Sequence, residues 1–149
     1  MSNQVPAWQG PILDNHFHLN RNGRYLDAAH DFKRAGGTNI VLIHCPDFAS
    51  PPTTKEGHRA AYQNTIAMAE SVRNELDLHV RVVLGPHPAA FAHQFIEWVD
   101  QEGGKGKNRA IENYRDSIDE AVKFYHEGNA HAIGEVGRPH WEVSQEIWD

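Results

Sequence analysis

The residues best suited to chemistry lie near the N-terminus, at residues 13–19 (LDNHFHL). An apolar stretch at 11–13 begins a predicted strand, and turn residues follow it. Side chains at positions i and i+2 of a strand point the same way, so Asp14, His16 and His18 are expected on one face. Two neutral imidazoles with a supporting carboxylate behind them suit zinc, iron, nickel or manganese. The alternative is one catalytic or core histidine beside a solvated neighbour, because short motifs of this kind also arise by chance.

A carboxylate far along the chain has the same character. Glu135 follows apolar residues in a strand that is predicted over 131–136. A buried carboxylate without a partner is costly, so Glu135 needs a cation or hydrogen-bond donors. An ion pair with Arg81 or Arg138 would satisfy it. If Glu135 reaches the same rim as the two histidines, a shared metal ion is the favoured interpretation, and the carboxylate could bridge two ions.

Other polar residues also follow predicted strands. His87, between Pro86 and Pro88, could contact a substrate or cap the next helix. The Arg138 guanidinium could bind a phosphate or carboxylate of the substrate, or form a structural ion pair. His44 could support a ligand, face the substrate, or be a core histidine that bonds a backbone carbonyl. Four further histidines on helix faces are expected to be solvated: His30, His58, His93 and His126.

Composition limits the class of protein. The chain has 149 residues, which predicts one domain over 1–149, and 40% of them are hydrophobic. The formal net charge of -6 excludes a global attraction to nucleic acid, so polyanion binding would need a local patch or metal ions. A single cysteine, Cys45, excludes a disulfide framework. No signal peptide and no stretch of membrane-spanning length is visible, so we expect a cytoplasmic protein without membrane partners.

Hydrophobic periodicity predicts alternating strands and helices. After the first strand, strands are predicted at 38–44, 80–84 and 131–136. Helices are predicted at 24–34, at 55–76, around Phe91–Val99, and at 110–127. The glycine- and lysine-rich stretch 103–108 is predicted to be a flexible linker. Ser144 is predicted to be the N-cap of a last helix.

This alternation is typical of parallel strands with right-handed crossovers, in either a doubly wound sheet or a (β/α)₈ barrel. The candidate residues follow the carboxyl ends of all four strands, which is where barrel active sites lie. No Gly-x-Gly-x-x-Gly follows the first strand, so a dinucleotide site is not expected. The predicted fold class is therefore α/β, with the parallel (β/α) units of a TIM barrel.

Three motifs, in this order, resemble those of one family. Residues 14–18 (DNHFH) are similar to the Asp-x-His-x-His first-strand motif of the TatD-related metal-dependent hydrolases, in the amidohydrolase-type barrel superfamily. Residues 85–88 (GPHP) resemble the Gly-x-His-Pro that follows strand three in that family. Residues 132–137 (AIGEVG) resemble its Ala-Ile-Gly-Glu-Ile-Gly after strand four. The following residues 137–140 (GRPH) replace the usual Gly-Leu-Asp and resemble an archaeal-type branch.

The resemblance implies a (β/α)₈ barrel with one or two divalent metal ions, of which zinc, manganese, iron or, less well, magnesium fit the ligands. His16 and His18 would bind the metal, Glu135 would ligate it and act in catalysis, and His87 and Arg138 would contact the substrate. Members with known activity are often deoxyribonucleases, so DNA is the first expected substrate. Hydrolysis of an amide, ester or lactone in a small molecule is the alternative.

The resemblance covers essentially this whole chain but only the N-terminal half of the barrel. The family's later ligands, two histidines and an aspartate, have no counterpart here. This favours a third alternative, a non-catalytic half-barrel fragment. A barrel usually needs about 250 residues, and half of one leaves two open strand edges. We therefore expect a missing C-terminal half or a homo-oligomer partner, and an isolated chain that is oligomeric or poorly folded.

Overall fold

The computed structural model describes residues 8–138, 142 and 145–147. The chain alternates strands with helices, and two successive helices precede the last strand; both features agree with the prediction. The elements are β1 (Leu13–Phe17), α1 (Leu26–Arg34), β2 (Asn39–Ile43), α2 (Lys55–Leu76), β3 (His79–Leu84), α3 (Pro88–Glu102), α4 (Gly104–His126), β4 (Ala132–Ile133) and the 3₁₀ turn η1 (Gln145–Ile147). The predicted N-cap Ser144 lies outside the described residues.

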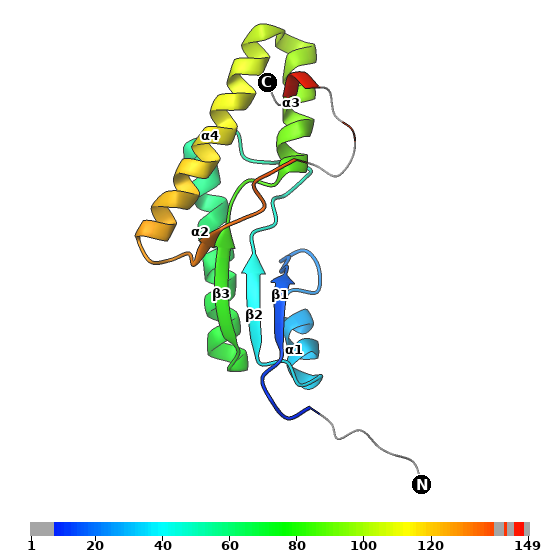
Figure 1. Cartoon of the computed structure of the whole chain (residues 1–149), viewed down its shortest axis with the longest axis vertical. Coiled ribbons are helices and arrows are strands. Elements are labelled where there is room, and N and C mark those ends of the chain that lie inside the picture. Colours follow the sequence, from blue (N-terminus) through cyan, green and yellow to red (C-terminus); the bar gives the residue numbers. More distant parts are fainter. Residues whose placement is uncertain (1–7, 139–141, 143–144, 148–149) are drawn as a thin grey trace.

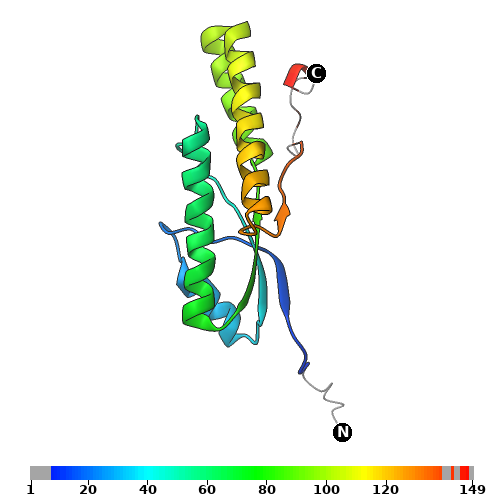
Figure 2. The ribbon, with the colours of Figure 1, turned by 90° about the vertical axis from the view of Figure 1, so that its left-hand side faces the viewer.

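The four strands form one parallel sheet in the order β1-β2-β3-β4 (Figure 1). A doubly wound sheet reverses its strand order at a switch point, whereas a barrel adds each strand beside the last. The observed order is that of a barrel portion, and the predicted α/β class with parallel (β/α) units is confirmed. Helices α1 and α2 lie on one side of the strands, and no helix of the described residues covers the other side (Figure 2).

The core lies between the sheet and α2. Alternate residues of the central strands are buried and face this helix, among them Ile40, Leu42 and Val82. They pack against apolar residues at helical spacing on α2, such as Val72 and Leu76. Full burial of each large apolar side chain contributes about 2 kcal/mol, so this layer fixes the positions of the strand ends.

A bulge in β1 changes which residues share a face. Asp14 pairs with Ile40, but Phe17 pairs with Leu42, so two residues of β1 lie opposite only one residue of β2. The extra residue places Asp14 and Phe17 on the helix-covered face. The prediction that Asp14 shares a face with His16 and His18 is therefore wrong. Side chains do not alternate strictly here, because the bulge adds one residue to β1 opposite a single residue of β2.

Helices α3 and α4 form a hairpin that extends beyond the carboxyl ends of the strands (Figure 1). The predicted linker at 103–108 is wrong, since only Gly103 (φ 60°) interrupts the two helices. Gly106 allows the close crossing, because a Cβ there would lie 1.9 Å from the carbonyl oxygen of Trp98. A second apolar cluster fills the hairpin, built from Phe91, Phe95, Trp98, Ala110 and Ile147.

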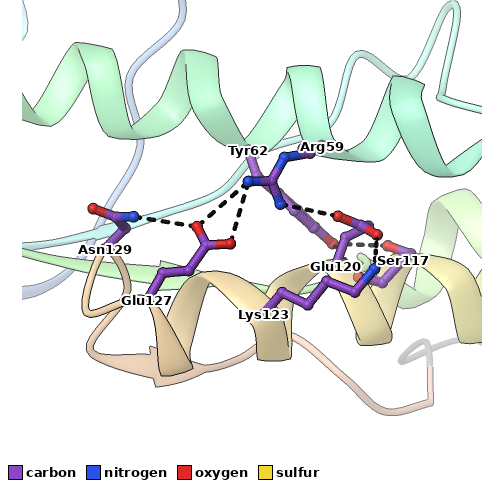
Figure 3. Close-up of polar contacts among 7 residues, drawn as sticks. All are labelled: Arg59, Tyr62, Ser117, Glu120, Lys123, Glu127 and Asn129. Atoms are coloured by element: carbon purple, nitrogen blue, oxygen red, sulfur yellow. Dashed lines mark hydrogen bonds and ion pairs between the residues drawn. The ribbon is translucent and has the colours of Figure 1, made fainter.

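Polar contacts join α4 to α2 (Figure 3). Arg59 of α2 pairs with Glu120 at 3.3 Å and with Glu127 at 3.2 Å. Lys123 also pairs with the buried Glu120, and these two cations hold the pKa of Glu120 below its usual value. The hydroxyl groups of Tyr62 and Ser117 lie 2.7 Å apart. The hairpin is thus anchored to the layer that supports the sheet.

Strand β4 is shorter than the predicted 131–136 and ends at Ile133. The chain then turns, since Glu135 has φ 64°. No helix of the described residues is long and apolar enough to cross a membrane.

Candidate metal centre

Three of the predicted site residues lie together at the carboxyl ends of β1 and β4. One ligand atom from each of His16, His18 and Glu135 can be chosen so that all lie within 4.8 Å of one another. Nε2 of His16 is 3.3 Å from Oε1 of Glu135. The side chain of His16 is 57% exposed and that of Glu135 only 16%. The cluster therefore combines a half-buried carboxylate with an accessible imidazole.

One hydrogen bond helps to position each histidine. Oδ1 of Asp14 accepts a hydrogen bond from the backbone N–H of His16 (2.9 Å), which holds the bulge. Nδ1 of His18 lies 3.1 Å from the carbonyl oxygen of Ile43. A carbonyl only accepts, so Nδ1 carries the proton and Nε2 of His18 keeps a free lone pair. A backbone partner on one nitrogen is the usual way in which proteins orient a metal-binding histidine.

The carboxylate of Glu135 lacks a hydrogen-bond partner for one of its two oxygens. Its Oε2 is the one buried side-chain oxygen or nitrogen among the described residues that lacks a hydrogen-bond partner. Nε2 of His87 lies 3.9 Å from this oxygen, beyond hydrogen-bond distance. Arg81, one of the two arginines considered as a partner, forms no ion pair with Glu135 in the described part of the chain. A cation would satisfy this oxygen.

His87 has the helix-capping role that the sequence allowed. Its Nδ1 accepts the backbone N–H of Ala89 (3.1 Å) at the start of α3. The proton of the neutral ring is then on Nε2, the nitrogen that faces Glu135. Contact of His87 with a substrate stays a prediction. Arg138 is exposed beyond β4, and its predicted substrate contact is likewise untested.

Two glycines bring Glu135 to this rim. A Cβ at Gly85 would lie 2.1 Å from the carbonyl oxygen of Gly134, and a Cβ at Gly134 would lie 2.4 Å from a methyl carbon of Val83. The backbones that follow β3 and β4 can approach this closely only without these side chains. Close packing of the two backbones therefore explains why glycine occupies positions 85 and 134 of the predicted motifs.

A buried polar layer adjoins the site, and sequence reasoning missed most of it. His58 is buried, not solvated as predicted, and its Nε2 lies 2.9 Å from Oδ1 of Asn113. His44 is a buried core histidine, but it bonds to Thr65 Oγ1 (2.8 Å) instead of a carbonyl. Burial, with a smaller effect of nearby imidazoles, lowers the pKa of His44 to about 4. A histidine on a helix face gives no sign of the second helix that covers it, so the burial of His58 was not predictable.

The donor set fits a divalent cation. Two imidazole nitrogens and a carboxylate oxygen suit zinc, manganese or iron better than magnesium, which prefers oxygen ligands. The unpartnered Oε2 of Glu135 is the observation that argues for a cation, because a carboxylate is otherwise costly to bury.

Comparison with known proteins identifies the family of this chain. The family model "TatD related DNase" matches residues 13–149. The uncharacterized protein MJ1127 of Methanocaldococcus jannaschii is 26% identical over 141 residues. That match covers 93% of this chain and 46% of the relative, so the chain spans about half the length of the curated protein it matches. No solved structure matches significantly. The family match, which includes all three clustered residues, shows that the chain belongs to the TatD-related DNases, a family of metal-dependent hydrolases.

Proposed function

We propose that this chain carries the metal site of a hydrolase that cleaves phosphodiester bonds in DNA. The observation that supports it best is the buried, unpartnered oxygen of Glu135 beside two imidazoles. Membership of the TatD-related DNases supports the choice of bond and substrate. The proposal takes residues 1–149 to be one domain of this barrel type, because α4 contacts both α2 and β4.

In this proposal His16, His18 and Glu135 hold at least one divalent ion. When bound, such an ion lowers the pKa of a water molecule and polarises a phosphoryl oxygen. Asp14 holds the backbone of His16, and the Ile43 carbonyl orients the His18 ring. His87 presents an N–H toward Glu135 and the substrate. Arg138 supplies a positive charge for a phosphate beyond β4.

Metal binding is the first test, because it does not depend on turnover. Metal-free protein is titrated with Mn²⁺ or Zn²⁺ by calorimetry. We expect one or two sites in the wild type and loss of a site in His16→Ala. His30→Ala, which removes an exposed histidine on α1, is the matched control and should bind as the wild type does. Equal binding by all three proteins would contradict the proposal.

Activity is the second test. With added Mn²⁺ or Mg²⁺, the wild type should release nucleotides from DNA, and His16→Ala should not. The same samples are given a carboxylic ester and a lactone, because a metal centre alone does not distinguish these bonds. Ester or lactone turnover without nuclease activity would replace the proposed substrate by the alternative. Metal binding without any turnover would favour the non-catalytic alternative.

A further inference from the structure

A groove beside the metal centre contains an arginine that neither the motifs nor the proposed function uses. One wall is the loop of Asn20, Arg21 and Asn22 after β1, and the other is the segment 47–49 after β2. His44 and Cys45 line the groove between these walls. The lining of the groove also includes Leu19, directly after His18, so the groove lies at the same carboxyl edge of the sheet.

The groove and the candidate metal centre are linked by a ring contact. Phe48, on its second wall, packs edge to face against His87, with ring centroids 5.1 Å apart. The same His87 faces Glu135. A chain-like substrate held at the metal centre would thus extend into the groove past Phe48.

Arg21 is held in place without being neutralised. Its Nε donates to Oδ1 of Asn64 (2.7 Å), and its guanidinium carbon lies 5.0 Å from the centre of the Tyr25 ring. Both partners are uncharged. A hydrogen bond within the loop supports its turn, since Oδ1 of Asn20 accepts the N–H of Asn22 (2.8 Å). The remaining N–H donors of the guanidinium are free to bind an anion bidentately.

Most other arginines of the described chain differ from Arg21 in this respect. Five of them pair with carboxylates: Arg24, Arg34, Arg59, Arg73 and Arg109. Among the described residues, Arg21 forms no such pair. The acidic residue of the opposite wall, Asp47, uses Oδ1 to accept the N–H of Ala49 (3.0 Å). A fixed but unpaired guanidinium in a chain of net charge -6 points to an anionic ligand.

We propose that Arg21 binds a phosphate group of the substrate next to the one that is cleaved. This inference rests on the proposed phosphodiester substrate and makes Arg21 a specificity residue, because an ester or lactone has no second phosphate to offer. Asn64 and Tyr25 are positioning residues that hold the guanidinium at the groove.

The test measures binding of a short fluorescent oligodeoxynucleotide to metal-free protein in EDTA, over a series of salt concentrations. Arg21→Gln should weaken binding about tenfold, as expected for loss of a charge-assisted bidentate contact. It should also reduce the slope of log K against log salt by about 0.7, the contribution of one phosphate contact in a single strand. Arg21→Lys should keep the slope and lose part of the affinity.

Three further variants sharpen the result. Arg115→Gln, which removes an exposed arginine of α4, should leave affinity and slope unchanged. Asn64→Ala should lower affinity but keep the slope, since the charge remains. Asp47→Asn should tighten binding, because it removes a negative charge and keeps the oxygen that accepts the Ala49 N–H.

Several results would overturn the inference: no oligonucleotide binding by the wild type, equal behaviour of Arg21→Gln and the wild type, or an equal loss in Arg115→Gln. Binding of inorganic phosphate without oligonucleotide would also overturn it. The proposed function fails separately. If metal-dependent cleavage is absent but Arg21→Gln reduces the slope, the proposed function is wrong and the Arg21 contact with phosphate stands. If cleavage occurs and Arg21→Gln leaves the slope unchanged, the proposed function stands and the Arg21 contact is wrong.

Discussion

The Glu135 residue combines two unfavourable features that a purely structural residue would avoid. Its backbone is left-handed at φ 64°, and one of its oxygens is buried without a partner. A strained non-glycine residue costs about 1 kcal/mol or more, and so does an unsatisfied buried polar atom. Costs of this kind persist at sites where the same geometry serves a ligand. Glu135 should therefore oppose stability in the absence of metal and increase it in its presence.

Substitution of Glu135 should therefore change stability in opposite directions without and with metal. In EDTA, Glu135→Gln should raise the free energy of unfolding by about 1 kcal/mol, because no unpaired charge remains buried. With saturating Mn²⁺ or Zn²⁺ the order should reverse, since the variant loses a ligand and binds more than about tenfold more weakly. Urea denaturation with and without metal checks both signs. Glu112→Gln, an exposed change on α4, is the control; wild-type metal stabilisation in Glu135→Gln would contradict the prediction.

The buried histidines predict a loss of stability in acid. Burial, helped by the imidazoles of His58, His18 and His87, lowers the pKa of His44 from 6.5 to about 4. Burial also lowers the pKa of His58. Both rings are therefore neutral in the folded chain under conditions where the unfolded chain already binds protons. Stability contributed by the neutral rings is present above pH 6.5 and falls as the pH drops below it.

For His44 alone, the loss between neutral pH and pH 4 should be about 3 kcal/mol. Urea denaturation in EDTA over this range should show it as a falling midpoint. His44→Gln should flatten the profile, whereas His30→Gln, at an exposed position, should keep the wild-type profile. A His44→Gln profile as steep as that of the wild type would contradict the assignment.

At the residue scale, the sequence predicts which side chains meet but not how they are held. The His16, His18 and Glu135 cluster follows from two motifs, at the ends of β1 and β4. The face on which Asp14 lies does not follow from its motif, because one extra residue in β1 places Asp14 on the opposite face from His16. The burial of His58 does not either, since it depends on Asn113, 55 positions away in the chain.

Elements position the site through the contact between β3 and β4. β4 forms only two register pairs with β3, so the ladder alone holds it weakly. The close approach of Gly85 and Gly134 is what brings Glu135 within reach of β1. A change in this packing should affect metal binding even though no ligand is altered.

Gly85→Ala tests this directly. The new Cβ would lie 2.1 Å from the carbonyl oxygen of Gly134, which is backbone and cannot rotate away. We expect about 1–3 kcal/mol of destabilisation from the clash and a weaker metal affinity by calorimetry. Gly137→Ala is the matched control, because a Cβ there meets nothing within 4 Å. Unchanged metal affinity in Gly85→Ala would show that β4 is held by other contacts.

The helices show how far periodicity alone can predict elements. The bounds of α2 agree with the prediction, because its apolar stripe is regular and its ends are marked by Thr54, whose hydroxyl caps the first turn, and Asp77. The prediction of a linker at 103–108 was wrong because a tertiary contact stabilises helix there. Glycine disfavours helix by about 1 kcal/mol in isolation, but at Gly106 its missing side chain permits the crossing with α3 that stabilises the helix.

The whole molecule has one covered and one uncovered sheet face. Helices α1 and α2 cover the first (Figure 2). The second carries exposed polar side chains, His79 and Arg81, and the apolar Leu13, which is 58% exposed. In the described chain both outer strands, β1 and β4, also have a free edge. Free edges are templates for pairing with another chain, and neither is blocked by a proline within its strand.

This arrangement predicts that the 149-residue chain associates in solution. Light scattering during size-exclusion chromatography should give a mass above that of one chain, and the mass should rise with concentration. Leu13→Lys should shift the equilibrium toward monomer, because a charge on an edge strand opposes pairing and Leu13 lies outside the core. Ile96→Lys changes a similarly exposed apolar position on the α3–α4 hairpin and should leave the mass unchanged. A wild type that stays monomeric and cooperatively folded at every concentration would show that the open sheet is stable by itself, since solvent would then satisfy both edges.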